Sequence, residues 1–233
     1  MTWRDFFDRD HALYVSERHK LLHADLVSKG VAAHIPRPDA QVLDYGCGEA
    51  LGAPYVSERC GKLYLFDTAP SVRAKLIAAN VARADVAVLD EAGVAAIPNG
   101  SLDMIVVVSV LQYVGEAELA RLLTTFRDKL KDDGKLVLAD IIPKDVSPID
   151  DARALIDFGL HGGFLVAALV GLARTALSDY RTLRQQYGLS FYDEADIREI
   201  LAEHDFSCAR APQNIGHNQN RMTFVARKVV ETD

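Results

Sequence analysis

The segment from Val42 to Gly48 constrains the fold more than any other part of this 233-residue chain. An apolar run ends there in Asp44 and is followed at once by a glycine-rich turn, and a second apolar run, Leu63 to Phe66, ends in Asp67. If the two runs are neighbouring parallel strands, both carboxylates lie at the sheet edge where open α/β folds bind their ligands. Glycine lets the backbone approach a ligand closely, and Asp67 can accept hydrogen bonds from both hydroxyls of a ribose. The pattern therefore predicts a site for an adenosine-containing cofactor.

The glycine spacing separates two classes of cofactor. Dinucleotide-binding proteins carry Gly-x-Gly-x-x-Gly, which opens a helix whose N-terminus holds a pyrophosphate. Here the third glycine, Gly52, comes one position late, and Glu49 would place a negative charge beside the pyrophosphate. A sulfonium cofactor carries no phosphate, so neither feature opposes it. A Rossmann NAD(P) oxidoreductase is therefore the less favoured alternative.

Six segments resemble, in order, the motifs of class I S-adenosylmethionine (SAM) methyltransferases. They are VLDYGCGEALG, LYLFDTAP, VAVLDEAGVAAIP, SLDMIVVVSVLQYV, KLKDDGKLVLADI and RMTFVARK. The resemblance covers residues 40–142 well and residues 186–228 loosely, whereas residues 1–35 and 145–185 have no counterpart. It departs from the family at Ala50, where glycine is common. The resemblance implies a Rossmann-like enzyme that transfers a methyl group from SAM to an acceptor.

The resemblance also implies which residues hold the cofactor. Asp44 would lie near the amino end of the methionine part, Asp67 would bind the ribose, and Asp90 would approach the adenine. The loop that begins at Ser109 would lie beside the sulfonium, and Tyr14 would close over the cofactor. The implied cofactor-binding residues are Tyr14, Asp44, Gly46, Cys47, Gly48, Asp67, Thr68, Asp90, Glu91, Ser109, Val110 and Leu111.

Several of these residues also have an ordinary structural interpretation. Asp44 can stabilise a turn, and Asp67 and Asp90 can cap the helices that follow them. Leu111 can belong to the core, and Tyr14 can serve packing alone. The cofactor-binding interpretation depends on the order and spacing of the motifs together.

No general base for methyl transfer is obvious among the seven histidines. His161 is the candidate catalytic residue because it stands in an apolar stretch, between Gly159 and Gly162, where a buried histidine would be costly without a partner. His217, in a polar loop before the last strand, is less favoured. An oxygen acceptor would normally need a base, whereas a neutral amine would not. The acceptor atom therefore stays open.

Composition narrows the partners and the compartment. The net charge of −7 and the pI of about 5.5 argue against nucleic acid, whose binders usually carry a basic face. Residues 109–112 also lack the Asn/Asp-Pro-Pro-aromatic run of methyltransferases that act on base amines. The three cysteines show no metal-ligand spacing, so no metal is expected. Their odd number and the polar N-terminus, which lacks a signal-peptide core, favour the cytoplasm.

Apolar runs alternate with helical patterns along the chain. Strands are predicted near 41–45, 62–66, 85–89, 103–109 and 135–142, and helices near 51–60, 69–80, 116–130 and 192–201, after one or two helices within 2–33. The resemblance adds a terminal antiparallel strand at 221–228. This alternation predicts a parallel sheet, and the continuously apolar strands indicate helices on both faces. With the resemblance, the expected fold is α/β, a doubly wound seven-stranded sheet that is mostly parallel with an antiparallel last strand.

One domain is expected over residues 1–233. Within it we distinguish an N-terminal helical cap (1–37), a cofactor-binding core (38–144), a helical insertion or lid before the last helix (145–190) and the end of the core (191–233).

The insertion contains an uncharged apolar stretch, residues 158–173. It is shorter than the roughly 20 residues that span a bilayer. Three interpretations compete: a helix that is buried or covers the substrate, a dimer contact, and a contact with a membrane surface. The chain could accordingly be a monomer or a homodimer. An apolar lid would suit a hydrophobic acceptor.

The function predicted from the sequence is transfer of a methyl group from SAM to a small-molecule, hydrophobic acceptor. The main alternative outside the enzymes is a SAM-binding module without catalytic activity, because fold and cofactor do not guarantee chemistry.

Overall fold

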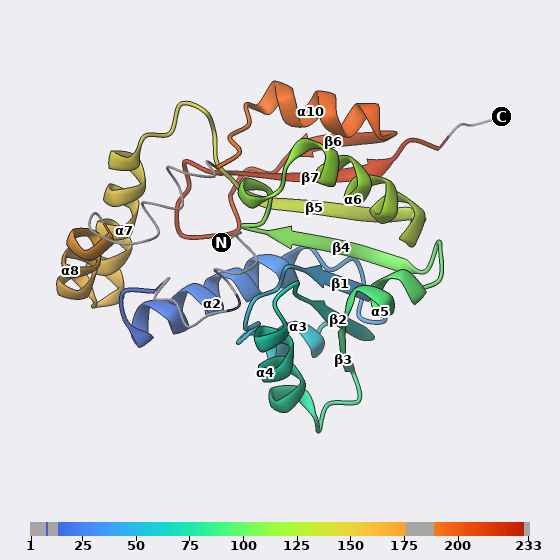
Figure 1. Cartoon of the computed structure of the whole chain (residues 1–233), viewed down its shortest axis with the longest axis horizontal. Coiled ribbons are helices and arrows are strands. Elements are labelled where there is room, and N and C mark those ends of the chain that lie inside the picture. Colours follow the sequence, from blue (N-terminus) through green and yellow to red (C-terminus); the bar gives the residue numbers. More distant parts are fainter. Residues whose placement is uncertain (1–7, 9–13, 176–188, 231–233) are drawn as a thin grey trace.

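The computed structural model describes residue 8, residues 14–175 and residues 189–230 (Figure 1). A seven-stranded sheet has the order β3-β2-β1-β4-β5-β7-β6. Its strands are β1 (Gln41–Tyr45), β2 (Lys62–Phe66), β3 (Val86–Leu89), β4 (Leu102–Val108), β5 (Leu130–Ile141), β6 (Phe206–Arg210) and β7 (Met222–Lys228). β7 is antiparallel to β5 and β6, and the other neighbouring pairs are parallel. The predicted sheet is confirmed.

The strand boundaries differ from the prediction at two informative places. β5 begins early because Leu130 pairs with Leu102 before a register shift that precedes Met104. β4 ends at Val108, since Ser109 has a φ of 58° and leaves the extended conformation. β6 was expected only through the resemblance. Among its residues only Phe206 is buried, so this edge strand leaves little apolar signal in the sequence.

Helices cover both faces of the sheet, as predicted. α2 (Glu17–Ala33), α3 (Ala53–Ser57) and α4 (Pro70–Asn80) pack on one face, and α5 (Glu91–Ala96), α6 (Glu116–Lys129) and α10 (Glu194–Glu203) pack on the other. Successive strand residues serve opposite cores: Val42 and Met104 belong to the first, Leu43 and Ile105 to the second. This alternation explains why the central strands are apolar throughout.

The apolar stretch 158–173 is not one helix, which corrects the prediction. It spans the end of α7 (Pro148–Gly162) and most of α8 (Leu165–Thr175), which form a hairpin. Gly163 adopts a left-handed φ of 73° and ends α7, a common function of glycine at a helix C-terminus. Gly159 lets the two helices approach, because an added Cβ would lie 3.0 Å from Cβ of Ala168.

The α7–α8 hairpin rests against the start of α2 at one end of the sheet (Figure 1). Nε of Arg18 donates to the carbonyl of Gly162, and an added Cβ at Gly171 would lie 2.1 Å from Cγ1 of Val15. Of the cap predicted within 2–33, the structure describes α2, and residues 1–7 and 9–13 lie outside the described part. No helix within the described residues is both long and apolar enough to cross a bilayer.

Candidate active site

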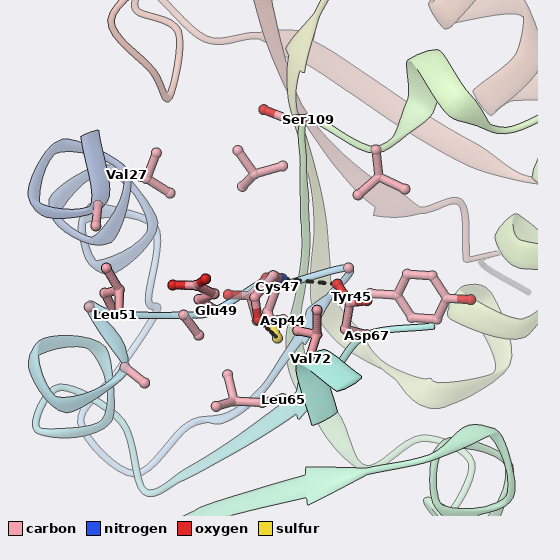
Figure 2. A pocket seen from close by; sticks show the side chains of 18 of the residues that line it. Val27, Asp44, Tyr45, Cys47, Glu49, Leu51, Leu65, Asp67, Val72 and Ser109 are labelled. Atoms are coloured by element: carbon pink, nitrogen blue, oxygen red, sulfur yellow. Dashed lines mark hydrogen bonds between the residues drawn. The ribbon is translucent and has the colours of Figure 1, made fainter. Parts of the chain in front are cut away.

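A cavity of about 850 Å³ lies between α2 and the ends of β1, β2 and β4 (Figure 2). This volume is near the upper end of the roughly 300–1,000 Å³ of small-molecule sites, so a cofactor and a second ligand can share it. The predicted cofactor residues that line it are Tyr14, Asp44, Gly46, Cys47, Gly48, Asp67, Thr68, Ser109 and Val110. One cavity thus gathers predicted residues from the segment before α2, from the first loop and from the ends of three strands.

The turn after β1 is shaped by positions where a side chain is excluded. Gly46 and Gly48 have φ values of 76° and 57°, which L-residues rarely adopt. An added Cβ at Gly46 would lie 2.5 Å from Cγ2 of Val110. The amides of Gly46 and Cys47 both donate to the carbonyl of Phe66, at 2.7 and 3.0 Å. The turn is therefore fastened to the end of β2 and presents bare backbone to the cavity.

Asp67 is oriented by backbone donors before any ligand arrives. Its Oδ2 accepts from the amide of Gly48 at 3.0 Å (Figure 2), and its Oδ1 accepts from the amide of Ala69 at 2.9 Å. Burial raises the pKa of Asp67, although these two hydrogen bonds oppose the shift. Each carboxylate oxygen has two lone-pair sites, so both can still accept from ligand hydroxyls.

Asp44 is the second carboxylate at this edge. Burial, together with the nearby charge of Asp67, raises the pKa of Asp44 to about 7. A third carboxylate, Glu49, also lines the cavity and forms an ion pair with Lys20 of α2. A ligand that carries a sulfonium and an ammonium would stabilise the ionised form of Asp44, whereas a pyrophosphate would add like charge beside it. The residues present therefore fit SAM better than a dinucleotide.

The end of β4 forms the other side of the cavity. Ser109 adopts a φ of 58°, and its hydroxyl donates to Oδ2 of Asp140 at 2.6 Å. Asp140, at the end of β5, also accepts from Asn214 at 3.0 Å and from Arg221 at 2.7 Å. This network fixes the loop that carries Ser109 and Val110.

Three predicted cofactor residues do not line the cavity. Leu111 is buried in the core with 3% of its surface exposed, as the structural alternative for this residue predicted. Asp90 caps α5, accepting from the amide of Gly93 at 2.8 Å, and its neighbour Glu91 faces Arg73 at 3.8 Å. An adenine-binding role for Asp90 and Glu91 stays a prediction.

His161 does not line the cavity, although it was proposed as the catalytic residue because a buried position was expected for it. Its side chain is 74% exposed, and its Nδ1 lies 2.9 Å from the carbonyl oxygen of Asp157, one turn earlier in α7. The expectation of a buried histidine was wrong because His161 stands on the solvent side of a two-helix hairpin. The geometry gives its catalytic role no support.

Sequence reasoning missed a histidine cluster beside the cavity. His19 and His23 lie one helical turn apart on α2, and His217 comes from the loop before β7; Tyr14 packs against the first two. The i, i+4 spacing of His19 and His23 was a signal available in the sequence. His217, which had been the less favoured base, joins them only through the tertiary structure. Burial lowers the pKa of all three, to about 4 for His19 and His217.

The chain matches a known family over most of its length. Residues 14–211 match the methyltransferase domain family. A comparison with curated proteins finds no match.

Solved structures share the fold at low sequence identity. Magnesium protoporphyrin IX methyltransferase from Synechocystis PCC 6803, with bound S-adenosylhomocysteine (SAH), has a TM-score of 0.59 at 20% identity, over 97% of this chain and 92% of that one. A complex of DhpI with SAH gives 0.62 at 12% identity, over 98% and 96%. The mitomycin 7-O-methyltransferase MmcR gives 0.61 at 15% identity, over 88% and 53%.

The family match and the sheet edge lead to the same assignment. The glycine turn and the oriented Asp67 suit any adenosine-containing cofactor, and the further acids Asp44 and Glu49 favour a cationic sulfonium over a pyrophosphate. The chain belongs to the methyltransferase domain family and is an enzyme that uses S-adenosylmethionine as its methyl donor.

Proposed function

We propose that this enzyme transfers the methyl group of SAM to a small molecule bound in the same cavity. The observation that supports the proposal most directly is the size and position of that cavity. It extends from the β1–β2 edge, where Asp44 and Asp67 lie, to the β4 edge and to α2. The cofactor would occupy the acidic side and leave the side of Ser109 and His23 to the acceptor.

The chain contributes binding and orientation to the reaction. SAM, when bound, supplies a methyl group activated by a sulfonium. Asp67, held by Gly48 and Ala69, would fix the ribose, and Asp44 would hold the cationic methionine end. The loop after Ser109, fastened to Asp140, would form the wall beside the reacting methyl group. Fixed orientation alone can contribute roughly 7–11 kcal/mol to such a transfer.

The arrangement of α2 supports an acceptor small enough to be enclosed. α2 crosses the cavity, contacts the α7–α8 hairpin and reaches Glu49 through Lys20. Exclusion of water by such a cover strengthens the electrostatic interactions inside. Two of the similar structures carry names of small-molecule acceptors, a porphyrin and a mitomycin.

The proposal is tested by following the methyl group. The protein is incubated with SAM labelled in its methyl group and with a cell extract divided into small molecules, proteins and RNA. We expect label in the small-molecule fraction. Label confined to protein or RNA would contradict the proposal, and SAM binding without label in any fraction would favour the non-catalytic alternative.

A further inference from the structure

His19, which is buried, and His23 and His217, which are partly buried, form a cluster with two phenylalanines on the acceptor side of the cavity. The ring of His19 stacks on Phe164 with centroids 5.0 Å apart, and the ring of His217 stacks on Phe158 at 4.9 Å. His23 lies between them, 6.2 Å from His19 and 5.7 Å from His217. Of the three histidines, only His23 lines the cavity. The other rings of the cluster therefore pack around His23, the one imidazole that is accessible from the cavity.

The cluster does not have the form of a metal site. Among the described ranges 14–175 and 189–230 and residue 8, no group of three histidine, cysteine or acidic residues is suited to hold a metal ion. Two of the three rings are stacked on phenylalanine rings. An acid–base role is the chemistry that a neutral imidazole offers instead.

The nitrogen atoms of the cluster indicate how His23 is oriented. Nδ1 of His19 accepts from the amide of Val15 at 3.3 Å, so its partner is local. Nδ1 of His23 and Nδ1 of His217 are both buried and have no hydrogen-bond partner among the described residues. Because Nδ1 of His23 is shielded, Nε2 is the ring nitrogen available to the cavity.

The charges around His23 are already paired with one another. Asp140 and Arg221 are its charged neighbours, and they bind each other at 2.7 Å. Asp140 also accepts from Ser109 and Asn214, and Arg221 also binds Asp151 at 3.2 Å. Asp140 is thus occupied and cannot readily take an ammonium group. An uncharged acceptor suits this side of the cavity better than an amine cation.

We propose that His23 is the general base for an acceptor that carries a phenolic or enolic hydroxyl, and that His217 positions it. This inference depends on the proposed function. The acceptor oxygen forms a bond to the methyl carbon while the carbon–sulfur bond breaks and its electron pair stays on sulfur, which leaves SAH. The hydroxyl becomes strongly acidic as its oxygen is alkylated, and its proton passes to Nε2 of His23. A hydrogen bond from Nδ1–H of His23 to Nδ1 of His217, formed by a small ring rotation, would hold the required tautomer.

The experiment uses the SAH-loaded full chain and matched pairs of probes at neutral pH. The hydroxyl probes are catechol and 2-naphthol, and their amine counterparts are ortho-phenylenediamine and 2-naphthylamine. Proton–nitrogen NMR spectra of the histidine side chains report His23 directly. We expect both hydroxyl probes to shift the Nε2 resonance of His23 and, with SAM present, to accept the methyl group in preference to the amines.

Variants separate catalysis from binding. We expect His23→Gln to lower the rate of methyl transfer by roughly 10²-fold or more, the contribution of a general base, while calorimetry gives the same SAH affinity. His204→Gln, at the distant end of α10, is the matched control. His217→Phe keeps a ring to stack on Phe158 but removes the nitrogen, so we expect mixed His23 tautomers and a lower kcat at unchanged KM.

The outcomes are decisive in both directions. The assignment of His23 would be overturned if neither hydroxyl probe shifted its resonance or accepted the methyl group. A preference for the amines, or full activity of His23→Gln, would overturn it as well. An unchanged tautomer in His217→Phe would remove His217 from the positioning role. If the wild-type chain did not bind SAH, the proposed function itself would be contradicted.

Discussion

The orientation of Asp67 is the clearest contribution of a single residue to the site. Two backbone amides hold its carboxylate toward the cavity. Because hydrogen bonds to a charged group are worth about 1.5–3 kcal/mol each, we expect Asp67→Ala to weaken SAM binding by about 10²-fold. Calorimetry measures the affinity, and thermal unfolding verifies the fold. Asp128→Ala, an exposed position on α6, is the control, and an affinity within a few-fold of wild type would exclude the ribose-binding role.

We expect Asp44 to make cofactor binding depend on pH. Its pKa in the free protein is about 7, and a cationic ligand favours the ionised form, so the pKa falls in the complex. Binding below pH 7 must therefore release a proton, and SAM affinity should rise with pH up to about 7 and then level off. Calorimetry in buffers of different ionisation enthalpy measures the released proton. Asp44→Asn should flatten the pH profile, and an unchanged profile would show that Asp44 does not contact the cation.

Among the secondary-structure elements, α2 acts as the cover of the cavity. The ion pair between Lys20 and Glu49 joins α2 to the glycine-rich loop after β1. Partly exposed ion pairs contribute about 0.2–1 kcal/mol of interaction free energy. We expect Lys20→Gln to speed SAH dissociation by up to about fivefold, measured by stopped-flow displacement. Lys29→Gln is the matched control, because it breaks an exposed pair with Asp25 on the same helix. Equal dissociation rates in the two variants would argue against α2 as a cover.

For the molecule as a whole, a buried ionic cluster lies at the amino ends of the strands, opposite the cavity at their carboxyl ends. Asp103, near the amino end of β4, has only 1% of its side chain exposed and binds Arg37, Lys131 and the amide of Gln41. Removal of a buried charge from such a set costs about 3 kcal/mol. We expect Asp103→Asn to lower the Tm by several degrees. At temperatures below the Tm of the variant, its SAM affinity should equal that of the wild type. Asp132→Asn, which removes an exposed carboxylate paired with Lys228, is the control. A loss of SAM affinity in Asp103→Asn would show that the two ends of the strands are coupled.

The parts predicted correctly from the sequence depend on local chemistry. The strand ends near Asp44 and Asp67 are visible because an apolar run stops at a carboxylate. Gly46 is favoured because its φ is positive and an added Cβ would collide with Val110. The hairpin of α7 and α8 was missed because an uninterrupted apolar composition concealed a helix end at Gly163. That end was recognisable in principle, since a glycine in the left-handed conformation commonly ends a helix.

The sequence by itself determined the five parallel strands, the glycine turn and the two acids at the strand ends, because strand patterns and turn chemistry act over a few neighbouring residues. Only the tertiary structure decided which histidine faces the cavity. His161 stands in the most apolar segment yet lies in solvent, whereas His23 and His217, almost two hundred positions apart, meet beside Asp140. Burial and contact between distant segments depend on how whole helices pack, and no local pattern encodes them.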